Sequence, residues 1–104
     1  AGEARRTREK QKEYQREESR LKRQISSLEN EINELEEKIT DLEELFSDPD
    51  FFSDVEKSQD KQKEYSQLKE NLSAKMEEWT ALEEQLEELN IEKEEAIDSM
   101  KGKS

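Results

Sequence analysis

The sequence predicts an all-α fold, an antiparallel two-helix coiled-coil hairpin. Three observations lead to this prediction. Only 28% of the 104 residues are hydrophobic and 46% are charged, which is too little apolar material for a compact globule but suits an elongated helical rod. Leucine and isoleucine recur with heptad spacing in two separate stretches. Between those stretches lies the only proline, Pro49, at which a continuous helix would break.

The first heptad stretch predicts a coiled-coil helix over residues 16–47. Leucine and isoleucine alternate there at steps of four and three residues, which are the a and d positions of a coiled coil. A second heptad register predicts another coiled-coil helix over residues 54–97, with Lys75 and Lys93 as polar exceptions. The seam residues of the two helices are Leu21, Ile25, Leu28, Ile32, Leu35, Ile39 and Leu42, and Tyr65, Leu68, Leu72, Trp79, Leu82 and Leu86.

The segment between the two helices, residues 48–53, is expected to form the tip of the hairpin. Pro49 lacks an N–H and disfavours helical geometry at Asp48, so the first helix should end near Phe46 or Ser47. Asp48 and Pro49 fit the cap and the first position of a short helical turn. The chain is therefore expected to reverse its direction at its only proline.

Two further features of the tip concern its capping and its aromatic residues. The run Ser53-Asp54-Val55-Glu56 fits the S-x-x-E capping box, and we expect it to start the second helix. Phe51 and Phe52 cannot join the heptad seam from this position. At least one of these rings should therefore cover the end of the seam, near Phe46 and Val55.

A single antiparallel register fits the whole seam. When Leu28 faces Trp79, every layer pairs an a position of one helix with a d position of the other. The same register places Glu31 opposite Glu78, an unfavourable pair of like charges. Exposed ion pairs contribute only about 0–1 kcal/mol each, so the apolar seam and not the flanking charge decides the fold.

Charge is distributed unevenly along the chain. The net charge is −12, yet residues 5–23 carry nine Lys/Arg against four Glu. We expect residues 1–15 to be a basic tether, frayed or partly helical, and residues 98–104 to be a disordered tail. The basic residues could neutralise phosphates, or they could form an ordinary solvated helix surface among neighbouring glutamates. They are Arg5, Arg6, Arg8, Lys10, Lys12, Arg16, Arg20, Lys22 and Arg23.

The residue types present exclude most catalytic and ligand chemistry. The sequence has no cysteine and no histidine, and we expect no catalytic, cofactor-binding or metal site. The aspartates of the tip lack the spacing of a calcium loop, and Gly102-Lys103-Ser104 lacks the spacing of a phosphate-binding loop. Tyr14 is the only aromatic residue in the basic segment, so base stacking is not supported. No apolar run is long enough to span a membrane or form a signal peptide, and the cytoplasm is the default compartment.

Three consecutive features resemble the C-terminal coiled-coil domain of the ABC-F family. They are the first heptad arm, the tip Asp48-Pro49-Asp50-Phe51-Phe52 and the second arm KEYSQLKENLSAKMEEWTALEEQLEEL, which contains Trp79. The likeness covers residues 4–92. Family members are soluble ATPases with two nucleotide-binding cassettes that bind the ribosome near the tRNA exit site. Their ATP turnover rescues stalled ribosomes or confers antibiotic resistance.

The resemblance implies a role as a non-catalytic interaction domain. None of the ATPase motifs lies in this sequence, so ATP and Mg²⁺ are expected for the parent protein only. The basic segment would contact ribosomal RNA or protein and would lead from the cassettes of the parent chain. In one branch of the family the domain resembles a DNA-binding coiled coil, which is the first alternative. A structural coiled coil for oligomerisation or scaffolding is the second, although we expect a monomer and no membrane contact.

Overall fold

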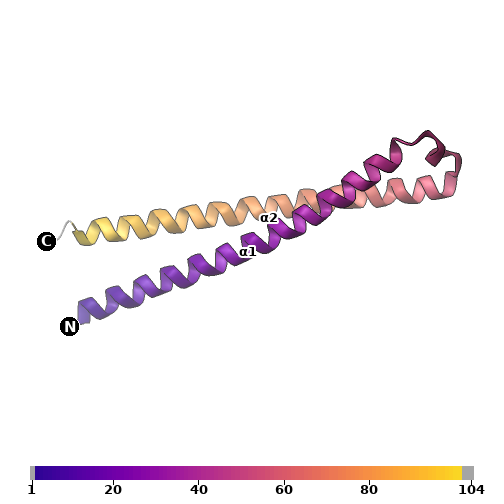
Figure 1. Cartoon of the computed structure of the whole chain (residues 1–104). Coiled ribbons are helices and arrows are strands. Elements are labelled where there is room, and N and C mark those ends of the chain that lie inside the picture. The colour runs from indigo at the N-terminus through magenta and orange to yellow at the C-terminus, as the bar shows by residue number, and fades with distance from the viewer. Residues whose placement is uncertain (1, 102–104) are drawn as a thin grey trace. The chain divides into compact units, whose positions relative to one another are not determined.

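The structure is a computed structural model that describes residues 2–101, and the side chains of residues 2–99. It consists of α1 (Gly2–Phe46), the 3-10 helix η1 (Pro49–Ser53) and α2 (Val55–Lys101), with no strand in this part of the chain (Figure 1). The predicted all-α fold, an antiparallel two-helix coiled-coil hairpin, is confirmed. Both helices are longer than the sequence suggested. Residues 2–15, expected to be a frayed or partly helical tether, and residues 98–101, expected to belong to a disordered tail, are helical, and Ala1 and residues 102–104 lie outside the described part.

The chain divides into two compact units, each of which joins part of α1 to part of α2. The terminal unit comprises Ala1–Ser26 and Thr80–Ser104, and the tip unit comprises Ser27–Trp79. Within each unit the α1 and α2 segments run antiparallel (Figure 1). Each unit therefore has its own stretch of the apolar seam.

In the tip unit, the seam is closed mainly by α1 side chains. Leu28, Ile39 and Leu42 are buried, and each contributes about 1.5–3 kcal/mol by its removal from water. The other predicted seam residues of this unit are half-buried, because a two-helix seam leaves one edge of each side chain open to solvent. They are Ile32, Leu35, Tyr65, Leu68, Leu72 and Trp79.

Side-chain hydrogen bonds between the helices agree with the predicted register of the tip unit. The Trp79 indole Nε1 donates to Glu29 Oε1 at 3.1 Å, and the Tyr65 hydroxyl donates to Glu43 Oε1 at 3.4 Å. Glu29 follows directly after the predicted partner of Trp79. In both pairs the ring lies in the seam, and its polar atom reaches a carboxylate at the rim.

Lys75 changes the electrostatics expected for the middle of the tip unit. The sequence placed Glu31 opposite Glu78, which would be repulsive. In the structure the Lys75 ammonium lies 3.1 Å from the Glu31 carboxylate and 4.0 Å from that of Glu78. The hydrogen bond to Glu31 raises the pKa of Lys75 above its ordinary value. The polar exception in the seam thus offsets part of the repulsion between the two acids beside it.

The terminal unit has a tight seam at one end and a looser one towards the chain ends. Leu21 is 2% exposed and Ile25 is 6% exposed, so both are fully packed. The predicted seam residues Leu82 and Leu86 on α2 are half-buried. Nearer the ends of the chain, the two helices enclose a groove of about 290 Å³ instead of a closed apolar layer.

The tip of the hairpin is closed by a cluster of aromatic rings. The Phe51 ring is 7% exposed and lies 5.6 Å from the Phe46 ring, centroid to centroid. Tyr65 packs against the other side of the cluster, edge to face with Phe46 at 5.4 Å. Phe51 thus covers the end of the seam beside Phe46, as expected, whereas Val55, near which the cover was also expected to lie, is 61% exposed. The rings of α1 and η1 therefore close the seam without help from the first residue of α2.

The cap of α2 also differs from the sequence prediction. The Asp54 carboxylate accepts a hydrogen bond from the Lys57 backbone N–H at 3.2 Å, so Asp54 caps α2, and not Ser53. Ser53 instead ends η1, and its hydroxyl donates to the Asp50 carbonyl at 2.6 Å. The η1 turn begins at Asp48, whose carboxylate accepts from the Asp50 N–H at 3.0 Å. The 3-10 turn thus includes Ser53, the first residue of the predicted capping box, and α2 begins at Val55, one residue later than the sequence predicted.

Candidate functional site

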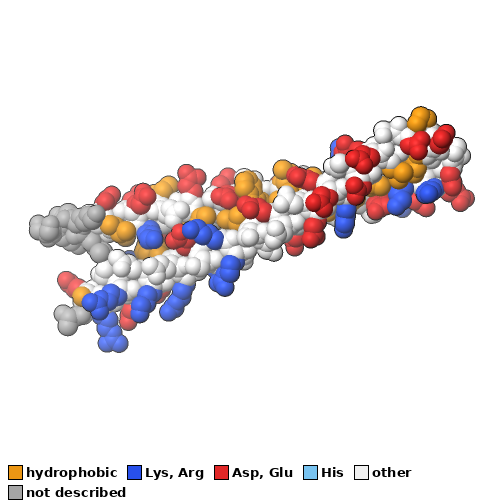
Figure 2. Space-filling view, in the orientation of Figure 1, with side chains coloured by type: hydrophobic (Ala, Val, Ile, Leu, Met, Phe, Trp, Pro, Cys, Tyr) orange, Lys and Arg blue, Asp and Glu red, His pale blue; other side chains and the backbone are white. Residues whose placement is uncertain are grey.

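The basic residues of α1 form a row on the outer face of the terminal unit. Arg5, Arg8, Lys12, Arg16 and Arg23 are separated by steps that, at 3.6 residues per turn, keep them on one side of the helix. This side is opposite to the one that carries the buried Leu21 and Ile25. We call these five residues the basic stripe. All five are exposed, and Figure 2 shows blue side chains along the N-terminal part of α1.

The two ends of the basic stripe make contacts within the helix. Arg5 Nε lies 3.5 Å from Glu9 Oε1, with 84% and 64% of the two side chains exposed, so this pair contributes little. Arg23 Nε donates to the Ser19 backbone carbonyl at 3.3 Å. Neither contact buries the cation. Both guanidinium groups can still meet an external anion.

The middle of the basic stripe is unengaged. Among the described residues, Arg8, Lys12 and Arg16 have no hydrogen-bond or ion-pair partner. At a rise of about 1.5 Å per residue, their side chains emerge along roughly 12 Å of one helix face. Three neighbouring exposed cations on the outer face of α1 thus lack an internal counter-ion.

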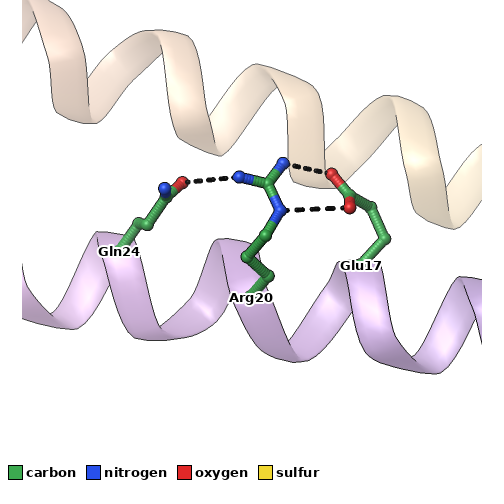
Figure 3. Close-up of polar contacts among 3 residues, drawn as sticks. All are labelled: Glu17, Arg20 and Gln24. Carbon is green, nitrogen blue, oxygen red and sulfur yellow. Dashed lines mark hydrogen bonds and ion pairs between the residues drawn. The ribbon is translucent and has the colours of Figure 1, made fainter.

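Arg20, a predicted phosphate-binding residue, is instead occupied by neighbours on its own helix. Its Nε donates to Glu17 Oε2 at 3.1 Å, its Nη2 donates to Glu17 Oε1, and its Nη1 reaches Gln24 Oε1 at 3.5 Å (Figure 3). The hydrogen bonds from Arg20 lower the pKa of Glu17, and the same contacts raise the pKa of Arg20. The Arg20 guanidinium is therefore engaged by its own helix, with 50% of the side chain still exposed.

Lys22 is likewise neutralised internally. Its ammonium lies 2.9 Å from the Glu18 carboxylate, which also receives Lys93 of α2 at 3.6 Å. The hydrogen bond from Lys22 is the main reason that the pKa of Glu18 lies below its ordinary value. This carboxylate joins the two helices of the terminal unit through Lys93, whereas Lys22 lies one turn further along α1 itself.

The remaining predicted cations, Arg6 and Lys10, lie beside the groove and not on the basic stripe. They line it together with Tyr14 and with Lys93 and Ala96 of α2. Lys93 is a cation that sequence analysis did not include in the candidate site. Lys93 is a polar exception at a seam position and faces Tyr14 in the predicted register. This pairing is the sequence signal that could have placed Lys93 in the candidate site.

No group of three or more His, Cys, Asp or Glu side chains between residues 2 and 99 could hold a metal ion. No helix in the described part of the chain is both long enough and apolar enough to cross a membrane.

Comparison with known proteins identifies the family. The family model for the ABC transporter C-terminal domain matches residues 5–84, which is more than half of the chain. No curated protein and no solved structure matches. The matched region contains the whole basic stripe, the tip and most of the seam. The chain therefore belongs to the ABC transporter C-terminal domain family.

Proposed function

We propose that this chain is a non-catalytic interaction domain of an ABC-F ATPase, and that its basic stripe contacts the ribosome. The contacted surface would be ribosomal RNA or a ribosomal protein, in the cytoplasm. ATP and Mg²⁺ enter this proposal only as ligands of the cassettes of the parent protein. The family supports a domain that accompanies an ABC protein, and the likeness of the tip and arms to ABC-F domains supports the more specific assignment.

The observation that carries the proposal is the unengaged middle of the basic stripe. Arg8, Lys12 and Arg16 project from the side of α1 that does not pack against α2, so an external polyanion can reach them directly. Guanidinium and ammonium groups in such a row bind phosphates and release counter-ions, which favours association. A row without aromatic side chains reads the backbone and shape of a nucleic acid and not its bases.

The charge of the rest of the chain favours a restricted contact. The net charge is −12 although the basic segment is positive, so the acidic surfaces repel any polyanion that approaches from another side. Duplex DNA offers a uniform backbone and could also meet the basic stripe. The ribosome offers local RNA surfaces beside basic proteins, which suit a small positive patch on an acidic domain.

A salt titration with purified ribosomes and with duplex DNA tests the proposal. The triple variant Arg8→Gln/Lys12→Gln/Arg16→Gln should make the plot of log affinity against log salt shallower by about three for ribosomes. The matched control is Lys57→Gln/Lys61→Gln/Lys63→Gln, which removes three cations from α2 in the tip unit. That control should leave ribosome binding unchanged.

The alternative functions give different results in the same experiments. Binding of DNA in preference to ribosomes, with loss in the triple variant, would assign the basic stripe to DNA. A dimer in sedimentation equilibrium, with no polyanion binding, would favour a scaffold. Equal ribosome binding by the triple variant and the wild-type chain would exclude the basic stripe as the contact.

A further inference from the structure

The tip of the hairpin carries an aromatic residue that remains partly exposed beside the closed end of the seam. Phe51 is buried at 7% exposure and closes the seam, whereas its neighbour Phe52 is 46% exposed. The large hydrophobic residues exposed to water at this end of the tip unit are therefore Phe52 and Val55, which is 61% exposed. Phe51 and Phe52 differ in exposure although they are adjacent in the same 3-10 turn.

Phe52 is held in a defined position despite its exposure. Its ring lies 5.4 Å from the Phe51 ring, edge to face, and 6.3 Å from the Phe46 ring. The η1 turn that carries it is capped by Asp48 at its start. A ring that is already ordered loses little conformational entropy when a partner covers it, which is a property of interface anchors.

The charge around Phe52 defines the partner. No lysine or arginine occurs between Lys38 and Lys57. This interval contains seven acidic residues, which are Asp41, Glu43, Glu44, Asp48, Asp50, Asp54 and Glu56. Lys57, Lys61 and Lys63 follow on α2, and the Lys69 ammonium lies 4.8 Å from the Tyr65 ring centroid, but the acidic residues outnumber these lysines. The field at the tip therefore favours cationic surfaces over nucleic acid and anionic surfaces.

We propose that the tip is a docking site for a protein surface on which lysine or arginine residues border an apolar pocket. Phe52 fills the pocket, and the aspartates of η1 and of its flanks meet the bordering cations. This interaction is separate from the polyanion contact proposed for the basic stripe. The basic stripe lies in the terminal unit and is positively charged, whereas the tip is acidic. The domain thus carries two contact surfaces that select partners of opposite charge.

A random peptide library displayed on phage provides a defined probe for this surface. The immobilised full chain should enrich clones with a net positive charge and at least one aromatic or aliphatic side chain. Synthetic peptides from these clones should bind the Phe52→Ser variant at least about tenfold more weakly than the wild-type chain. The matched control is Ile91→Ser, which removes a residue that is 48% exposed in the terminal unit and should leave affinity unchanged.

A second variant tests the role of charge without removing the caps. Asp48→Asn/Asp50→Asn/Asp54→Asn keeps oxygen acceptors at both cap positions, because asparagine caps helices about as well as aspartate. It should weaken peptide binding about tenfold at low salt and less at high salt, where the charges of the wild-type chain are screened. Circular dichroism should show unchanged helix content in both tip variants.

Several outcomes would overturn the proposal. It fails if no clone is enriched on the wild-type chain over Phe52→Ser, or if the enriched clones are neutral or acidic. It also fails if the asparagine variant binds as tightly as the wild-type chain. Self-association that disappears in Phe52→Ser would assign the tip to a second copy of this chain instead.

Discussion

Trp79 combines two contributions to the tip unit that a pair of substitutions can separate. Its ring is half-buried in the seam, and its indole N–H donates to Glu29 at 3.1 Å. Trp79→Phe keeps most of the ring and removes the donor, and it should lower the free energy of unfolding by about 1 kcal/mol. Trp79→Ala also removes the packing and should cost about 3 kcal/mol.

Both changes can be measured by urea unfolding followed by far-ultraviolet circular dichroism. Tryptophan fluorescence cannot be used, because these variants lack the only tryptophan. Glu29→Ala combined with each substitution completes the comparison. The Phe substitution should show almost no further loss in the Glu29→Ala background. Equal costs for the Phe and Ala substitutions would mean that the ring contributes no packing.

Glu18 is the residue whose ionisation joins the helices of the terminal unit. Contacts with Lys22 and Lys93 lower its pKa from the ordinary value of 4.5. A carboxyl group whose pKa is lower in the folded chain than in the unfolded chain stabilises the fold at pH values above its unfolded-state pKa. That stabilisation is lost as the pH falls through the folded value. The melting temperature of the wild-type chain should therefore exceed that of Glu18→Gln at pH 7, and the difference should shrink below pH 4.5 and disappear once the pH is below the lowered pKa of Glu18 in the folded chain.

The comparison with Glu18→Gln is needed because acid also relieves repulsion among the other carboxylates of a chain with net charge −12. That general effect is nearly the same in the two proteins and cancels in the difference. Thermal melts at several pH values give the result. A difference that stays constant down to acidic pH would show that ionisation of Glu18 contributes nothing.

At the scale of the helix, the start of α2 depends on Asp54. Its carboxylate accepts the Lys57 N–H, whereas the Ser53 hydroxyl bonds within η1. Asp54→Ala should therefore lower the free energy of unfolding by about 1 kcal/mol, and Ser53→Ala should cost less. Chemical denaturation of both variants checks the order. A larger loss for Ser53→Ala would restore the capping box predicted from the sequence.

The elements show which parts of the fold local sequence can predict. Heptad spacing and Pro49 are enough for two antiparallel helices and their register, because burying the seam leaves a single alignment. The choice between Ser53 and Asp54 as cap depends on the geometry of η1, since both residue types cap well. α1 begins at Gly2, well before the stretch 16–47 for which the heptad spacing predicted a coiled-coil helix. Residues 2–15 are rich in Arg, Lys, Glu and Gln, which are good helix formers, and Arg5–Glu9 adds an i,i+4 pair.

The candidate site was predictable in composition but not in detail. The clustering of cations in residues 5–23 is visible in the sequence. Helical spacing then separates those on the outer face, such as Arg8 and Arg16, from those beside the groove. Which cations are neutralised depends on side-chain conformation. Arg20 has carboxylates within reach and pairs with one, and the sequence does not determine that choice.

At the scale of the whole molecule, the seam provides a prediction about association. In both units one helix segment comes from α1 and the other from α2 of the same chain. Unfolding of such a chain is unimolecular, so its melting temperature should not change between about 5 and 500 µM protein. A helix pair formed between two chains would instead gain stability with concentration by mass action. Differential scanning calorimetry over this range tests the expectation, and sedimentation equilibrium should give the mass of one 12.4 kDa chain. A melting temperature that rises with concentration would mean that partner chains complete the seam, and the separate roles proposed for the basic stripe and the tip would then have to be tested on a dimer.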